Sequence, residues 1–130
     1  MNKFKIAVIG GDGIGPEIIS CAKDLIIAIA TKYGLQFEFF DILAGGCAID
    51  AFGVPLRQQD LETAKSCDAV LLGSIGGEKW NAMPVRPEAA LLQIRKELNL
   101  YANLRPAYLF KQLINACPLR KDITKMESIL

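Results

Sequence analysis

Residues 5–17 read KIAVIGGDGIGPE, and this stretch decides the fold class. Its first half is a short β-branched apolar run closed by two glycines, which predicts a buried strand over residues 5–9. Pro16 suits the first turn of a helix, and Glu17 complements the positive end of the helix dipole. The stretch therefore predicts a strand, a glycine turn and a helix in direct succession.

The rest of the chain continues this alternation. Runs in which apolar and polar residues alternate, or in which all residues are apolar, predict three further strands, over 35–40, 68–73 and 100–104. Helical spacing of apolar residues predicts helices over 16–33, 48–52, 57–66 and 87–99. We therefore expect an α/β fold, in which a parallel-rich sheet carries helices on both faces.

Composition excludes several classes of protein. The chain has 130 residues, of which 52% are hydrophobic, and a net charge of +1, so it is neither disordered nor built to bind nucleic acid or an anionic membrane. The absence of histidine excludes Ser-His triads and imidazole metal sites within it. The cysteines show no C-x-x-C spacing and the N-terminus lacks a signal sequence, which predicts a cytoplasmic protein with reduced, mostly buried thiols; a disulfide pair is the alternative. These cysteines are Cys21, Cys47, Cys67 and Cys117.

The glycine turn has three interpretations. A dinucleotide fingerprint needs a third glycine where Pro16 stands, and Asp41 lies further along than a ribose-binding acid usually does. A second interpretation is a tight strand-to-helix connection with no ligand. The third depends on motifs elsewhere in the chain.

Those motifs are IAVIGGDGIGPE at 6–17, LLGSIGG at 71–77, RPE at 86–88 and YANLRP at 101–106. In this order they resemble the β-decarboxylating dehydrogenases, the isocitrate/isopropylmalate dehydrogenase family. The resemblance covers residues 1–107 and fades after Cys117. Family chains are more than twice as long, so we expect an N-terminal portion that is incomplete at its C-terminal end. Residues 1–100 then match the N-terminal part of the first α/β domain, and residues 101–130 begin a second domain.

The resemblance implies an NAD-dependent oxidative decarboxylase of 3-isopropylmalate in leucine biosynthesis. Hydride leaves the carbon that bears the 2-hydroxyl group, and decarboxylation follows with the assistance of Mg²⁺ or Mn²⁺. It also implies a cytoplasmic homodimer with a small dicarboxylate substrate and no nucleic-acid or membrane partner. The alternatives are an isocitrate, homoisocitrate or tartrate type of the same family, a Rossmann-like nucleotide-binding module, and a non-catalytic subunit that pairs with a longer chain.

The predicted helix after Pro87 carries the candidate substrate residues. Their spacing of three to four residues places Glu88, Leu91, Leu92 and Arg95 on one face. Two guanidinium groups, with Arg105 as the second, suit a dicarboxylate. From the residues alone, surface arginines and core leucines are the alternative.

The resemblance implies that Arg95 and Arg105 bind the malate carboxylates and that Leu91 contacts the branched alkyl group, with Leu92 beside it. Isocitrate dehydrogenases carry Ser and Asn where this chain has Ala89 and Leu91, and an apolar wall would leave the third carboxylate of isocitrate unpaired. We therefore expect an aliphatic substrate arm.

The resemblance also assigns residues to the nicotinamide half of the cofactor: Ile14, Gly77, Glu78, Lys79, Trp80 and Glu88. Packing of its own loop is the other interpretation of Trp80. The family's metal ligands and catalytic Lys and Tyr match positions beyond residue 130, so we expect neither catalytic residues nor metal ligands in this chain, and no turnover by the chain alone. The resemblance matches none of the following aspartates to a metal ligand of the family: Asp12, Asp41, Asp50, Asp60, Asp68 and Asp122.

Overall fold

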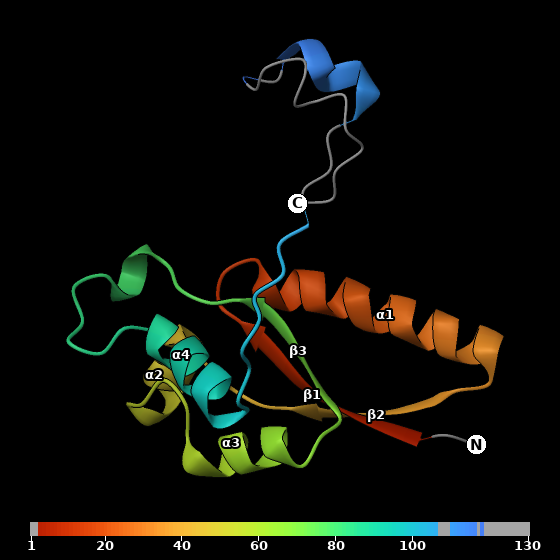
Figure 1. Cartoon of the computed structure of the whole chain (residues 1–130). Coiled ribbons are helices and arrows are strands. Elements are labelled where there is room, and N and C mark those ends of the chain that lie inside the picture. Colours follow the sequence, from red (N-terminus) through yellow and green to blue (C-terminus); the bar gives the residue numbers. More distant parts are fainter. Residues whose placement is uncertain (1–2, 107–109, 117, 119–130) are drawn as a thin grey trace. The chain divides into compact units, whose positions relative to one another are not determined.

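The computed structural model describes residues 3–106, 110–116 and 118. The chain divides into two compact units, residues 1–99 and residues 100–130 (Figure 1). The first unit holds the sheet and all of the α-helices that the structure describes. The assignment of these ranges to a first and a second domain stays a prediction.

The sheet has three parallel strands in the order β2-β1-β3. The strands are β1 (Lys3–Gly11), β2 (Gln36–Asp41) and β3 (Ala69–Ser74). In the central strand, Ile6 is in register with Phe39 on one side and Ala69 on the other. The predicted parallel α/β architecture is confirmed.

Helix α1 (Gly15–Tyr33) covers one face of the sheet (Figure 1). Alternate side chains of β1 point to this face, where Ile6 and Val8 pack with Ile19 in a small core. The helix ends at Gly34, whose left-handed conformation lets its N–H bond the Ala30 carbonyl.

The other face carries α2 (Gly46–Phe52), α3 (Gln58–Lys65) and α4 (Glu88–Glu97) (Figure 1). Ala7 and Ile9 of β1 point to this larger core, and Ile9 is fully buried. Burial of one such side chain contributes about 1.5–3 kcal/mol. Ala90 and Ile94 bring α4 into this core, which fixes the direction in which its remaining side chains point.

Two expectations were wrong. Residues 100–106 form no strand, because an extended segment becomes a strand only by pairing, and no described strand pairs with it. The cysteines are not mostly buried: Cys21 is exposed on α1, and Cys47 and Cys67 are half-buried, all three as free thiols. Cys117 and Asp122 lie outside the described residues.

Short 3₁₀ segments occur at Glu78–Trp80 and Lys111–Ala116. No helix among the described residues has both the length and the apolar character needed to cross a bilayer.

One exposed flank of α1 is apolar. Ile18, Leu25 and Ile29 are 46%, 62% and 42% exposed, and their spacing places them on one face of the helix. This stripe lies beside the side of the helix that packs Ile19 into the core, so the apolar surface of α1 extends from the core onto one exposed flank.

Candidate functional site at the carboxyl edge of the sheet

The connections of two neighbouring strands leave the sheet on opposite faces. β1 continues into α1 on one face, whereas β3 leads to α4 on the other. In open α/β sheets, ligands bind outside the carboxyl ends of the strands at such a switch point. The loops that follow β1 and β3 at this point contain Ile14 and Gly77, two of the predicted cofactor residues.

Asp12 joins these loops. Its side chain is buried, with 3% of the residue exposed. One carboxylate oxygen accepts hydrogen bonds from the N–H groups of Gly46 and Gly76, both at 2.8 Å, and the other accepts from Cys47 at 2.7 Å. Its own N–H donates to the Ser74 carbonyl at 2.6 Å. One carboxylate therefore connects the loop after β1, the start of α2 and the loop after β3.

The glycines of the turn serve close packing of the backbone. A side chain at Gly15 or Gly73 would overlap the carbonyl oxygen of Gly10, so α1 approaches both strands at distances that only glycine permits. This packing agrees with the interpretation as a tight strand-to-helix connection.

Glu88 lies against the loop after β3. A Cβ placed on Gly76 would be 2.8 Å from a carboxylate oxygen of Glu88. Glu88 is exposed, and no hydrogen bond or ion pair engages it within the part of the chain that the structure describes. Its carboxylate is therefore available to a ligand with hydroxyl or N–H donors.

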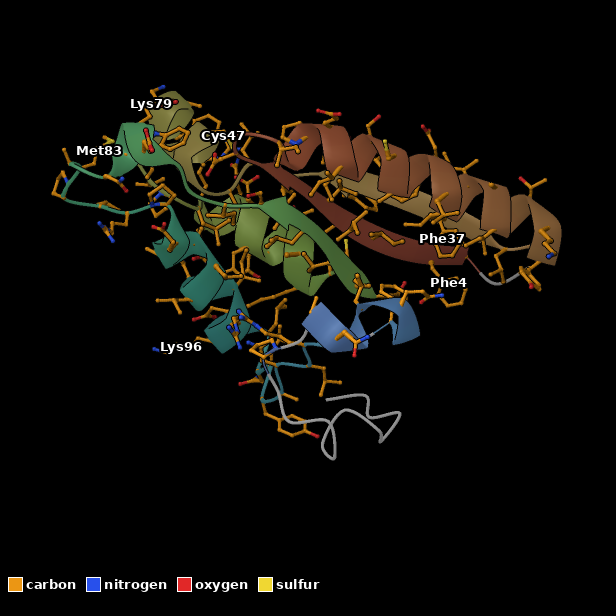
Figure 2. The ribbon with its side chains drawn as sticks, turned by 90° about the horizontal axis from the view of Figure 1, so that it is seen from above. Phe4, Phe37, Cys47, Lys79, Met83 and Lys96 are labelled. Carbon is orange, nitrogen blue, oxygen red and sulfur yellow. The ribbon has the colours of Figure 1, made fainter. Side chains whose placement is uncertain are left out.

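The 78–80 turn is attached to α2. The Trp80 indole N–H donates to Asp50 at 3.1 Å, and the Lys79 ammonium pairs with the same carboxylate at 2.6 Å. The indole ring covers Gly46, where any side chain would overlap it. Figure 2 shows Lys79 beside the helix that carries Cys47, with Met83 further out on the loop. Trp80 thus packs the 78–80 turn against α2, and Lys79 is engaged by Asp50 of the same helix.

Two pKa values in this region are displaced. Hydrogen bonds from Lys79 and Trp80 lower the pKa of Asp50. Burial, followed by the nearby charge of Asp12, raises the pKa of the Cys47 thiol, whose S–H donates to the Ala44 carbonyl at 3.3 Å.

The predicted substrate residues of α4 lie outside both cores. Leu92 is 66% exposed and Leu91 is half-buried, so the alternative of core leucines is wrong. Arg95 is half-buried, and among the described residues no acceptor or carboxylate pairs with it. Leu91 and Arg95 stand one turn apart, so one helix face offers an aliphatic surface beside an unpaired cation.

Arg105 is exposed and belongs to the second unit. Its pairing with Arg95 around one ligand stays a prediction. Glu78 and Ile14 are also exposed, and the latter is 62% exposed at the start of α1.

An open hollow of about 450 Å³ lies elsewhere, between the carboxyl ends of β1 and β2 and the start of α1. Val8, Pro16 and Asp41 are in its wall, and none of the predicted substrate or cofactor residues lines it. Asp41 is paired with Lys23 at 3.2 Å. The hollow is mostly apolar, and it borders the Asp12 site through Gly11 and Cys47.

Within residues 3–106, 110–116 and 118, no group of three side chains of the metal-binding types lies together. Sequence reasoning overlooked Asp12 as a site residue. The available signal was an acidic residue among four glycines between a strand and a helix, where nothing local explains a carboxylate.

A parallel sheet with helices on both faces, whose loops converge at a switch point, defines an α/β protein of the doubly wound class. A sequence model of the family described as isocitrate/isopropylmalate dehydrogenase matches residues 5–130. The chain belongs to this family.

Individual relatives agree with this assignment. A 3-isopropylmalate dehydrogenase of Moorella thermoacetica is 53% identical over 123 residues, which are 92% of this chain and 34% of that protein. One of Aquifex aeolicus is 50% identical over 127 residues, 96% of this chain and 35% of that protein. The chain therefore spans about a third of the length of the curated relatives it matches.

Solved structures are similar as well. An isocitrate dehydrogenase of Methylococcus capsulatus superimposes with a TM-score of 0.68 at 33% identity, covering 85% of this chain and 30% of that one. A β-decarboxylating dehydrogenase of Thermococcus kodakarensis gives 0.64 at 37% identity, covering 82% and 30%.

Proposed function

We propose that this chain carries the nicotinamide-facing surface and part of the substrate site of an NAD-dependent oxidative decarboxylase of 3-isopropylmalate, in leucine biosynthesis. The observation that carries the proposal is on α4, where Arg95 lacks a partner among the described residues and Leu91 stands one turn before it. A cation beside an aliphatic surface matches a carboxylate that lies next to a branched alkyl group.

Arg95 binds one malate carboxylate through its planar guanidinium group, which engages two oxygens at once. Arg105 supplies the second cation. Leu91 and Leu92 pack against the isopropyl group and exclude water from it. An extra carboxylate at that position would be buried without a partner, so these leucines select against isocitrate.

The residues at the switch point fit a nicotinamide nucleotide. Glu88 offers a free carboxylate that accepts hydrogen bonds from ribose hydroxyls, and the exposed side chain of Ile14 offers an apolar surface to a flat ring. Gly77, Glu78, Lys79 and Trp80 border the same half of the cofactor. When bound, NAD supplies the acceptor for the hydride that leaves the substrate.

A divalent cation, Mg²⁺ or Mn²⁺, belongs to the proposed reaction, but the described residues offer no cluster to hold it. We also infer a cytoplasmic homodimer, in which residues 1–100 belong to a first α/β domain and residues 101–130 to a second.

A chimera tests the proposal. The chain is joined to the part of the Moorella thermoacetica relative that it does not match, and NADH formation is followed by the absorbance of the reduced nicotinamide. We expect turnover with 3-isopropylmalate that greatly exceeds turnover with isocitrate.

Substitutions in the chimera assign the roles. Arg95→Met should lower kcat/KM by roughly 100-fold or more, because a bound carboxylate loses a charged hydrogen-bonding partner. Leu91→Asn should lower kcat/KM for 3-isopropylmalate by about 10- to 100-fold, as expected for a lost apolar contact. Lys96→Asn, on an exposed position of the same helix, is the matched control. An active chimera that Arg95→Met leaves unchanged would contradict the proposed substrate site.

A further inference from the structure

The buried carboxylate of Asp12 has no part in the chemistry proposed above, yet it bonds backbone positions that the proposed cofactor residues Glu88 and Trp80 contact. Asp12 precedes Ile14 by two positions in the loop after β1. It binds the N–H of Gly76, against which Glu88 lies. It also binds the N–H of Gly46, which the Trp80 indole covers.

We infer that Asp12 is the positioning residue of the nicotinamide site, because its single carboxylate sets the mutual placement of Ile14, the 77–80 turn and Glu88. The inference rests on the proposed function and extends it to a residue that contacts no ligand. A buried carboxylate that accepts three N–H bonds holds its partners more firmly than neutral acceptors do, since charge-assisted hydrogen bonds are about twice as strong.

The three bonds predict an unequal response to Asp12→Asn. An amide has one oxygen, which can replace the oxygen that serves both Gly46 and Gly76. Its NH₂ group then faces the N–H of Cys47, where two donors oppose each other. The Cys47 contact is lost first, and the first turn of α2 is then free to rotate about Gly46, which the amide oxygen still holds to the loop after β3.

The chain contains a reporter and a matched control. Trp80 is its single tryptophan and lies on Gly46, so its emission reports the placement of α2 against the 77–80 turn. Asp60 is the other buried acidic residue that the structure describes, and it pairs at 2.7 Å with Arg57, the residue that precedes α3. Asp60→Asn removes the same charge without touching the three loops.

The test uses the full 130-residue chain and nicotinamide mononucleotide as the probe, with binding followed by ¹⁵N–¹H spectra of the Ile14 and Gly77 amides. In Asp12→Asn we expect a shift of Trp80 emission, faster hydrogen exchange at Cys47 than at Gly46 or Gly76, and roughly tenfold weaker binding of the probe. In Asp60→Asn we expect native emission and native affinity. If the native chain binds the probe but Asp12→Asn and Asp60→Asn have the same emission and the same affinity for it, the positioning role alone is overturned.

If the probe leaves the Ile14 and Gly77 amide resonances of the native chain unchanged, the cofactor assignment is overturned. The positioning role then fails with it, whatever the Trp80 emission shows. Should Asp12→Asn not fold, native-state hydrogen exchange of the unsubstituted chain decides the matter. The amides of Gly46, Cys47 and Gly76 should then open in one event with one free energy. Three separate opening free energies would contradict a shared anchor.

Discussion

The carboxylate of Glu88 lies over the backbone of Gly76, so closely that a Cβ there would be 2.8 Å from Oε1. Gly76 also has a φ of 106°, which L side chains rarely adopt. The loop after β3 and the start of α4 therefore meet at a position where two independent requirements select glycine.

We predict that Gly76→Ala lowers the free energy of unfolding by about 1–3 kcal/mol, the usual cost of a strained backbone conformation. Most of this cost is strain, because the Glu88 carboxylate ends a flexible side chain and can move aside. Urea denaturation measures the stability, and the Glu88 amide resonance reports the displacement.

Gly53→Ala is the matched control, since Gly53 has a φ of 74° and open space around it. It should cost about 1–2 kcal/mol in stability and leave Glu88 in place. Unmoved Glu88 resonances in Gly76→Ala would refute the contact between them.

Strand and helix positions followed from the sequence because their causes are local. The β-branched run before Gly10 and the proline at position 16 mark β1 and α1 within two residues of their observed limits. The segment 100–104 has the same apolar character, but no strand pairs with it among the described residues, and pairing is not a local property.

The role of Asp12 is non-local in the same sense. Its partners Gly46 and Gly76 lie 34 and 64 residues further along the chain, so no window of sequence connects them. The face of α4 was predictable from the spacing of Leu91 and Arg95, since helical geometry alone places them together. The relation of Arg95 to Arg105 depends on how two units assemble, which helical periodicity does not determine.

Acid should release the 78–80 turn. Lys79 and Trp80 lower the pKa of Asp50 from its ordinary value of 3.8, so the contact stabilises the fold above that value and is lost as the pH falls through the lower, folded-state pKa. We predict a change in Trp80 emission with a midpoint below pH 3.8. Circular dichroism recorded in parallel separates this step from unfolding of the sheet.

Asp50→Asn removes the titrating group and should abolish that step. Glu97→Gln is the control, because the pKa of Glu97 is also lowered, by Lys65, but the pair lies away from the tryptophan on α3 and α4. A midpoint above pH 3.8, or a step that persists in Asp50→Asn, would count against the Asp50 contact.

The thiols should differ in reactivity. Burial and the charge of Asp12 raise the pKa of Cys47, which reduces its thiolate fraction near neutral pH, whereas Cys21 is exposed. We predict that iodoacetamide modifies Cys47 more slowly than Cys21, with peptide mass spectrometry identifying each site. Asp12→Asn should increase the rate at which iodoacetamide modifies Cys47 and leave the rate at Cys21 unchanged. An equal increase at both thiols would indicate general loosening of the fold.

The apolar stripe of α1 should drive association between chains. Ile18, Leu25 and Ile29 expose a continuous apolar face, and exposed patches of this kind favour contact with other apolar surfaces. We predict that Leu25→Lys reduces concentration-dependent association in sedimentation velocity, while the free energy of unfolding changes by no more than about 0.5 kcal/mol, as is usual for exposed positions. Asp24→Asn raises the net charge by the same single unit on a different side of the helix and should leave association as it is. If both variants dissociate equally, charge repulsion rather than the stripe governs association; if neither does, the contact between chains lies elsewhere on the molecule.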